Sequence, residues 1–442
     1  MNTSIIYLLG LACSSSLPQD SQSQDSAVQD SDTDTGLVDD TGDTGEGPTG
    51  SEAWCAPLAA PSGQIVEVGP DDDLEAVLEG LPAGATALLA AGTYTLNSES
   101  YIRLVEDGVR IQGATGNAED VVIDGNWEAG FGLSIQASDV VVSDLTLQRF
   151  YYHPIHVTPG SGRSIEGVQI YRVRVIDGAE QAIKINTGGD GSLFSDSGSI
   201  ACSHLELTDA GRAQVRNNCY TGGVDAHQAR GWEIRDNRIE GFWCESGLSE
   251  HGVHFWRGGR DTQVFRNVLV NNARGIGFGL GSDDVGRRYD DAPCGGEIAQ
   301  SYGEVAVNNL VFADSDALFA SSSGFDVGIA LESACQATVV HNTVYSTQAP
   351  YSSIEYRWPL SSGVIANNLV SHNVRDRGAG EIQLSANLDE APADWFVDAA
   401  GLDLHLAAGA GAIDAGDASH GVAEDADGVE RGISPDVGAL EY

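Results

Sequence analysis

The segment Ile183-Lys184-Ile185-Asn186 has apolar residues at its first and third positions and polar residues at its second and fourth. Two later segments repeat this pattern, Val224-Asp225-Ala226-His227 and Val253-His254-Phe255-Trp256. A period of two places alternate side chains on opposite faces of a β-strand. We therefore predict repeated strands whose first and third residues point into a core and whose second and fourth residues point outward.

Five more segments fit the same alignment, with apolar residues or Ala at the inward positions. They are Leu133-Ser134-Ile135-Gln136, Ile155-His156-Val157-Thr158, Ile276-Gly277-Phe278-Gly279, Ile329-Ala330-Leu331-Glu332 and Ile354-Glu355-Tyr356-Arg357. The 442-residue chain contains 55 Gly and 13 Pro, a composition that suits many short strands joined by tight turns. Equivalent strands along one chain predict a solenoid in which each coil packs on the next.

A second recurring motif places Asn or Asp between apolar residues. It occurs around Asp124, Asp144, Asn237, Asn267, Asn309, Asn342 and Asn368. Asn adopts left-handed turns readily, and stacked Asn side chains hydrogen-bond along a repeat. We therefore interpret these residues as a structural ladder rather than as sugar ligands.

The N-terminal region differs in composition from the rest. Residues 1–12 contain the apolar run Ile5–Ala12 and end before Cys13, an arrangement that resembles a bacterial lipoprotein signal with Cys13 as the acylated residue. Residues 13–52 are rich in Ser, Asp, Thr and Gly, which predicts a disordered acidic tether. We expect residues 53–442 to form the folded domain. We expect export to the outer membrane or cell surface, or else secretion, with membrane contact only through the lipid on Cys13.

Six further cysteines remain, an even number that predicts disulfides in an exported protein. They are Cys55, Cys202, Cys219, Cys244, Cys294 and Cys335. The sequence leaves their pairing open. The formal net charge of -43 excludes nucleic acid as a partner, because such a surface repels phosphates. We expect a monomer.

One short amphipathic helix precedes the strands. Leu74, Leu78 and Leu81 have helical spacing, and Asp72 with Glu75 matches a capping box. A single helix ahead of many strands predicts a cap on one end of the solenoid.

The cap helix, the coil pattern and the ending Gly432–Tyr442 resemble the pectin-lyase-like superfamily, and within it secreted bacterial parallel β-helix repeat proteins. The resemblance spans residues 60–442. It implies an all-β fold, a right-handed parallel β-helix. Many members are polysaccharide lyases or hydrolases and others have no assigned reaction. The resemblance therefore implies a polysaccharide groove, but no complete catalytic motif of pectate lyases, polygalacturonases or alginate-type lyases is present.

Equivalent outward residues of a β-helix form columns, because adjacent coils are about 4.8 Å apart. The first column is His156, Lys184, Asp225, His254, Gly277, Ala330 and Glu355. The second column is Thr158, Asn186, His227, Trp256, Gly279, Glu332 and Arg357. We expect Gly277, Gly279 and Ala330 to leave a shallow depression in an exposed groove, and Trp256 to stack on a sugar ring.

The first column contains the only lysine of the chain, Lys184. Unlike Arg, Lys acts as a base when it loses its proton. β-Elimination of a uronate needs a base, a group that neutralises the carboxylate and a proton donor. We predict Lys184 or His254 as the base, Asp225 as a Ca²⁺ ligand or orienting group, and Asn186 with His227 as the carboxylate site.

Three candidate residues lie farther along the columns. Glu355 and Arg357 are about five coils, roughly 24 Å, from Lys184, so we predict that they and Glu332 serve distal sugar subsites. A Glu332–Arg357 ion pair is an equally good interpretation.

The preferred hypothesis is a polysaccharide lyase acting on a uronate-containing glycan. A non-catalytic glycan-binding surface lipoprotein is the first alternative. A glycoside hydrolase is the second, and it would need two carboxylates about 5–9 Å apart, for which Glu250 is the only candidate near Asp225. A transition-metal site formed by Asp225, His227 and His254 is a weaker hypothesis.

Overall fold

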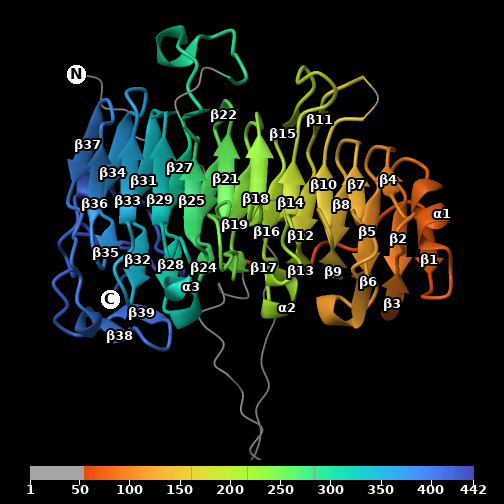
Figure 1. Ribbon diagram of the computed structural model, residues 1–442, viewed down its shortest axis with the longest axis horizontal. Coiled ribbons are helices and arrows are strands. Elements are labelled where there is room, and N and C mark those ends of the chain that lie inside the picture. The colour runs from red at the N-terminus through yellow and green to blue at the C-terminus, as the bar shows by residue number, and fades with distance from the viewer. Residues whose placement is uncertain (1–53, 161, 217, 282–284) are drawn as a thin grey trace, which may run out of the picture. The chain divides into compact units, whose positions relative to one another are not determined.

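Long parallel sheets make up most of the computed structural model, which describes residues 54–160, 162–216, 218–281 and 285–442. The coils stack in chain order, from the orange end to the blue end in Figure 1. Each complete coil contributes one strand to each of three sheets, and the connections recur from coil to coil. This is the right-handed parallel β-helix that the sequence predicts. The predicted signal, tether and acylated Cys13 fall on residues outside the described ones.

Within the described residues the first sheet has 12 strands, and the second and third sheets have 10 each. The first sheet contains β1 Ile65–Val68, β2 Thr86–Leu89, β5 Arg110–Gly113, β8 Val141–Ser143, β12 Gln169–Tyr171, β16 Ser199–Ala201, β19 Glu233–Arg235, β23 Gln263–Phe265, β27 Val305–Val307, β31 Ala337–Val340, β34 Gly363–Ala366 and β37 Ile382–Ser385. The second sheet contains β4 Ile102–Leu104, β7 Leu133–Ile135, β10 Ile155–Val157, β14 Gln181–Ile185, β18 Gly222–His227, β21 Val253–Trp256, β25 Arg274–Phe278, β29 Val327–Glu332, β33 Ser352–Arg357 and β36 Val374–Arg377. The third sheet contains β3 Gly92–Thr95, β6 Val121–Asp124, β9 Thr146–Phe150, β13 Arg174–Gly178, β17 His204–Glu206, β20 Arg238–Glu240, β24 Val268–Val270, β28 Leu310–Ala313, β32 Thr343–Ser346 and β35 Leu369–Val370.

Shorter elements lie in the connections. The remaining strands are β11 Ile165–Glu166, β15 Ser195–Asp196, β22 Gly259–Arg260, β26 Ser301–Tyr302, β30 Ala334–Cys335, β38 Phe396–Asp398 and β39 Asp403–Leu406. The α-helices are α1 Leu74–Glu79, α2 Asp209–Arg212 and α3 Asp316–Ala320, and short 3₁₀ helices lie at Ala118–Asp120, Pro293–Gly296, Ala393–Trp395 and Ala418–His420. None of the described helices is long and apolar enough to cross a bilayer.

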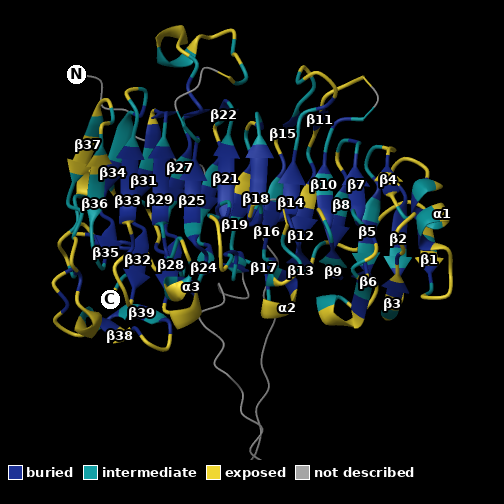
Figure 2. Cartoon of the chain, viewed as in Figure 1, coloured by how far each residue is buried: buried dark blue, intermediate teal, exposed yellow. Residues whose placement is uncertain are grey.

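A continuous apolar core runs through the coils between the three sheets. Inward residues such as Ile183, Ile185, Val224 and Phe255 have no exposed surface. Figure 2 shows most strands of the central coils in dark blue, and most of the exposed residues in the connecting turns and in strands at the two ends such as β1 and β37. Each strand pairs with its equivalents one coil before and one coil after, so the backbone hydrogen bonds of the interior are satisfied from coil to coil.

The predicted ladder is confirmed for the asparagines and is wrong for Asp124 and Asp144, whose carboxylates bind arginine and glutamine side chains instead. In each step the Oδ1 of one Asn accepts the backbone N–H and the Nδ2–H of the Asn one coil earlier. The ladder runs through Asn237, Asn267, Asn309, Asn342, Asn368 and Asn387. Most of these amides are completely buried, so they hold the turn between the first and third sheets and are not available to a ligand.

Helix α1 forms where the apolar spacing predicts it, with Leu74 and Leu78 buried. The predicted capping box of Asp72 and Glu75 is wrong by one residue, because Asp73 is the N-cap and accepts a backbone N–H of the first turn. Asp72 instead accepts the backbone N–H of Gly69 at 2.7 Å and closes the preceding turn. The role of the helix as an end cap stays a prediction.

The residues after β37 form no further coils in the described structure. Their apolar side chains pack on outward residues of the third sheet, among them Val270, Phe312 and Tyr345. The strands of the third sheet therefore have apolar side chains on both faces. One face packs in the solenoid core, and the other packs against the C-terminal segment. The ending Gly432–Tyr442, which carries part of the family resemblance, therefore covers the outer face of the solenoid.

The even number of cysteines is explained by three disulfides in the described residues. They join Cys55 to Cys202, Cys219 to Cys244, and Cys294 to Cys335. Each ties a loop or the start of the described chain to the solenoid. Disulfides of this kind are typical of exported proteins.

We expect His405, in the C-terminal segment, to titrate well above neutral pH. Its Nδ1 donates to Asp403 at 2.6 Å and its Nε2 donates to Asp427 at 2.7 Å. The hydrogen bond to Asp427, helped by Asp403 and opposed by burial, raises the pKa of His405 to about 9. Because the folded pKa is raised, this stabilisation is complete below the unfolded value of about 6.5 and is lost as the pH rises through about 9.

The measurement is an NMR titration of the His405 ring resonances. Asp427→Asn should move the midpoint down by at least about one unit, because one of the two carboxylates is removed. A wild-type midpoint near 6.5 would contradict the doubly hydrogen-bonded geometry.

Candidate active site

The eight aligned segments all lie in the second sheet, and the predicted register is confirmed. His156 pairs with Lys184, Lys184 with Asp225, and Asp225 with His254 on adjacent parallel strands. The same column continues through Gly277, Ala330 and Glu355. The second column is likewise in register, with His227 beside Trp256 and Glu332 beside Arg357.

The first column is covered rather than open. Lys184 is 3% exposed, while Asp225 and His254 have no exposed surface. The prediction of an exposed strand face is therefore wrong for this column. The cause is that residues preceding β18 and β21 fold back over the sheet, where Tyr220 bonds to Lys184 and His251 packs on His254.

The Lys184 ammonium group donates three hydrogen bonds. Nζ donates to the carboxylate of Asp225, to the Tyr220 hydroxyl at 3.0 Å and to His227 Nε2 at 3.0 Å. The ion pair with Asp225 is almost completely buried on both sides. An acceptor role for Nε2 places the proton of a neutral His227 on Nδ1.

Asp225 is the centre of the cluster. Its second oxygen accepts from Trp256 Nε1 at 2.8 Å, and Tyr220 donates to the first oxygen at 3.2 Å. Burial opposes ionisation, but the Lys184 ammonium and the neighbouring histidines hold the pKa of Asp225 well below its ordinary value. A carboxylate so fully engaged does not fit a Ca²⁺ ion, because the ion would have to displace these donors.

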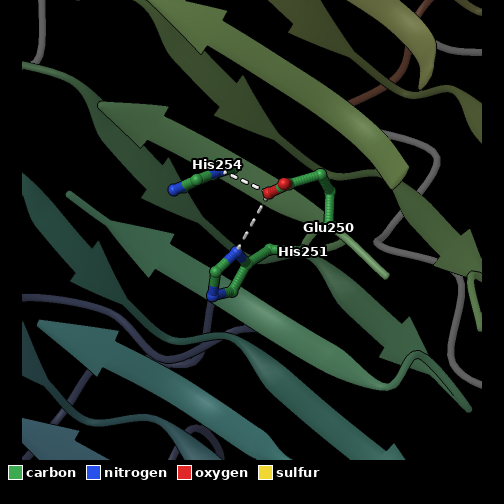
Figure 3. Close-up of side chains that lie close together, drawn as sticks. All are labelled: Glu250, His251 and His254. Atoms are coloured by element: carbon green, nitrogen blue, oxygen red, sulfur yellow. Dashed lines mark ion pairs between the residues drawn. The ribbon is translucent and has the colours of Figure 1, made fainter. Parts of the chain in front are cut away.

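His254 lies one coil beyond Asp225 and forms an ion pair with Glu250, with Nδ1 2.9 Å from Oε2 (Figure 3). Its Nε2 donates to the backbone oxygen of Gly279 at 3.0 Å, and its ring stacks on Trp256 with centroids 5.3 Å apart. Burial lowers the pKa of His254, but the Glu250 and Asp225 carboxylates outweigh it, so the pKa is raised.

The predicted depression at the two glycines is wrong. A Cβ on Gly277 would lie 2.6–2.7 Å from three ring atoms of His251, so the imidazole fills the space above this glycine. A Cβ on Gly279 would lie 1.9 Å from the backbone oxygen of Glu332, so that glycine permits a close backbone approach. Ala330 is 1% exposed.

The second column remains accessible beside this covered cluster. His227, Trp256 and Asn186 are half-buried. The rings of His227 and Trp256 meet edge to face at 4.7 Å. Asn186 Nδ2 lies 3.2 Å from His156 Nε2. Burial, with the charge of Lys184 adding to it, lowers the pKa of His227, so its neutral form is favoured.

The three distal candidates are not brought to Lys184. Arg357 lies 3.7 Å from Glu332, so the ion pair that the sequence left open is present. Glu332 also accepts the backbone N–H of Gly281 at 2.9 Å. Glu355 is 2% exposed and pairs with Arg377 on the next coil.

Sequence reasoning missed two groups that complete the site. Tyr220 lies in the turn before β18, outside the aligned four-residue segments. The one sequence signal near it is the neighbouring Cys219, which forms a disulfide. An aromatic cluster centred on Phe131 continues the accessible surface past His156, with ring centroids 5.7 Å apart, and includes the exposed Tyr152. Period-two alignment has no signal for residues in turns.

The fold and the face together define the chain as a right-handed parallel β-helix protein. No family model matches the chain, and no curated protein matches it. Among solved structures it is similar to pectate lyase Pel9A, with 14% identity and a TM-score of 0.55 over 88% of this chain and 99% of that one. It is also similar to the tailspike of E. coli bacteriophage HK620, solved with a pentasaccharide, with 12% identity, a TM-score of 0.50, and 76% and 66% of the two chains covered. At these identities the likeness establishes the fold.

Proposed function

We propose that this protein binds and cleaves a uronate-containing polysaccharide by β-elimination over β14, β18 and β21. The observation that carries the proposal is the hydrogen bond between the buried Lys184 ammonium and the half-exposed His227, beside an accessible Trp256. This arrangement connects the only lysine of the chain to the surface. The likeness to a pectate lyase fold supports polysaccharide as the class of substrate.

The proposed roles follow the hydrogen bonds. A uronate carboxylate against His227 Nδ1–H stabilises the imidazolium, which draws a proton from Lys184 along the 3.0 Å hydrogen bond. Neutral Lys184 then removes the proton α to the carboxylate, the bond to the leaving oxygen breaks, and a carbon–carbon double bond forms. Tyr220 lies 3.0 Å from Lys184 Nζ and supplies the proton to the leaving oxygen. Burial raises the pKa of Tyr220, so it carries this proton before the reaction. The proton that Lys184 took from the sugar then passes to the Tyr220 oxygen, and the His227 imidazolium returns its proton to Lys184.

The remaining residues hold the site and the sugar chain. Asp225 orients Lys184, and His254 is assigned to positioning because both of its ring nitrogens are engaged and none of its surface is exposed. Asn186 joins His227 as a donor to the carboxylate. Trp256 provides one stacking surface. The Phe131 cluster, which lies one coil beyond His156, provides a second. No step is assigned to Ca²⁺.

Glycan binding without cleavage is the second candidate. The observation that favours it is the closed Lys184–Asp225 ion pair, which holds the proton that the base must lose. Hydrolysis has less support, because Glu250 approaches the same histidine as Asp225 but Asp225 has no surface for a sugar.

We expect the purified protein to release unsaturated uronate products from at least one member of a panel of pectate, alginate and glycosaminoglycans, followed by ultraviolet absorbance. His227→Ala should lower the rate by about 100-fold or more, the usual effect of removing an acid–base group. His420→Ala, in the C-terminal segment, is the matched control and should leave the rate unchanged.

Each other outcome assigns a different function. Binding of a glycan with no product, weakened in Trp256→Ala, would replace the lyase with the binding protein. New reducing ends without unsaturation would indicate a hydrolase. An equal rate in wild type and His227→Ala would contradict the proposed site.

A further inference from the structure

Three side chains point at one another: His254 of the covered column, and Glu250 and His251, which precede its strand (Figure 3). One ligand atom of each lies within 4.8 Å of the other two. Glu250 Oε2 is 2.9 Å from His254 Nδ1 and 4.0 Å from His251 Nδ1. Two imidazole nitrogens and a carboxylate oxygen therefore converge on a common point.

The converging atoms are buried, and one of them has no partner. His254 Nδ1 and Glu250 Oε2 meet each other in the 2.9 Å ion pair, while His251 Nδ1 makes no hydrogen bond with any described residue. His251 is 2% exposed and His254 has no exposed surface. Buried polar atoms normally find a partner, and the ion pair of Glu250 with His254 leaves His251 Nδ1 with none. A buried imidazole nitrogen without a partner, next to a carboxylate and a second imidazole, is typical of a site that holds a bound cation.

We propose that Glu250, His251 and His254 bind a transition-metal ion of the Zn²⁺ class. Two histidines and a glutamate are a donor set that zinc uses, with the fourth position left to water. Metal–ligand bonds of about 2.0–2.2 Å in a tetrahedron separate the ligand atoms by about 3.3 Å, and the 2.9 and 4.0 Å separations bracket that value. Ca²⁺ requires an oxygen-rich set of six or more ligands, which this cluster lacks.

The local fold builds this geometry. Glu250 and His251 immediately precede β21, and His254 is an outward residue of that strand. The absence of a side chain at Gly277 makes room for the His251 ring, because a Cβ there would overlap it. The Glu250 side chain is 14% exposed and gives a metal ion access from solvent.

A second group of potential ligands does not fit equally well. His204 Nε2 is already hydrogen-bonded to Glu240 at 2.6 Å, and Glu240 also accepts from Arg238 at 2.7 Å. This group, which includes Glu206, offers one imidazole and two carboxylates, and the Glu240 carboxylate is neutralised by Arg238. This group serves as the internal control.

The proposal goes beyond polysaccharide cleavage and does not depend on it. His254 Nδ1 lies 3.7 Å from Asp225, so a bound cation would add positive charge beside the covered column. The test uses metal binding itself, so a protein that cleaves no glycan can still satisfy it.

The experiment starts from the full chain without an affinity tag, stripped of metal by a chelator and dialysed. Zn²⁺ is titrated in competition with a chromogenic chelator, and Co²⁺ is added separately to record its visible spectrum. We expect one equivalent of Zn²⁺ and the intense visible bands of tetrahedral Co²⁺. Glu250→Gln and His251→Phe should weaken Zn²⁺ binding by at least about 100-fold, since loss of even an outer-shell partner costs 10- to 100-fold. His204→Phe should bind as the wild type does.

Thermal melts of all variants without metal establish that they are folded, and Glu250→Gln is the mildest change because Glu250 is half-buried. Equal Zn²⁺ binding by wild type and a folded Glu250→Gln variant would overturn the proposal. So would loss of the site in His204→Phe, or binding of Ca²⁺ in preference to Zn²⁺. Octahedral Co²⁺ spectra would also overturn it, because they would indicate a solvent-exposed ion outside this cluster.

Discussion

Lys184→Met should lower the free energy of unfolding by about 3–5 kcal/mol, because removal of one partner leaves an uncompensated buried charge. Asp225 has no exposed surface, and Lys184 is the cation against it. Tyr220 and Trp256 are neutral donors, His254 is already paired with Glu250, and His227 would have to take up a proton to replace the lost charge. The measurement is the urea midpoint of wild type and variant at neutral pH.

The double variant Lys184→Met/Asp225→Leu provides the control. With both charges replaced by apolar side chains of similar size, most of the lost stability should return, as it does for other buried ion pairs. A single variant within about 1 kcal/mol of wild type would mean that Asp225 takes up a proton at little cost. The Lys184–Asp225 pair would then contribute little to the structure.

Asn309→Ala should destabilise the centre of the solenoid by about 3 kcal/mol or more, because several buried polar groups lose their partners at about 1–3 kcal/mol each. Oδ1 of Asn309 accepts both the backbone N–H and the side chain of Asn267. Its Nδ2 donates to the backbone oxygen of Val264 and to Asn342. Hydrogen exchange should show reduced protection of the Asn267 amide in particular.

Asn387→Ala is the matched comparison, because Asn387 ends the described ladder and is half-buried. Its loss leaves groups that water can reach, so we expect about 1 kcal/mol. Equal effects at Asn309 and Asn387 would contradict the view that the cost comes from buried, unsatisfied groups in the interior of the ladder.

The strand register could be predicted because it depends on a local property. In segments such as Ile183–Asn186 every second residue is apolar, and a shift of one position would turn Ile183 and Ile185 to the outside. The same reasoning placed Lys184, Asp225 and His254 in one column, and it identified the Asn ladder. It could not show whether the column is open, since alternation describes one strand and its faces but not what lies above them.

Short-range alternation and residue counts were enough to predict the solenoid, its register, the asparagine ladder and the presence of disulfides. The cysteine pairing, the covering of Lys184 by Tyr220, and the meeting of Glu250 and His251 with His254 above Gly277 depend on tertiary packing. Those contacts are made by turns whose course depends on packing against neighbouring coils. No periodic pattern encodes the path of such turns. The positions of the turn residues at the site could therefore not be predicted from the strand alignment.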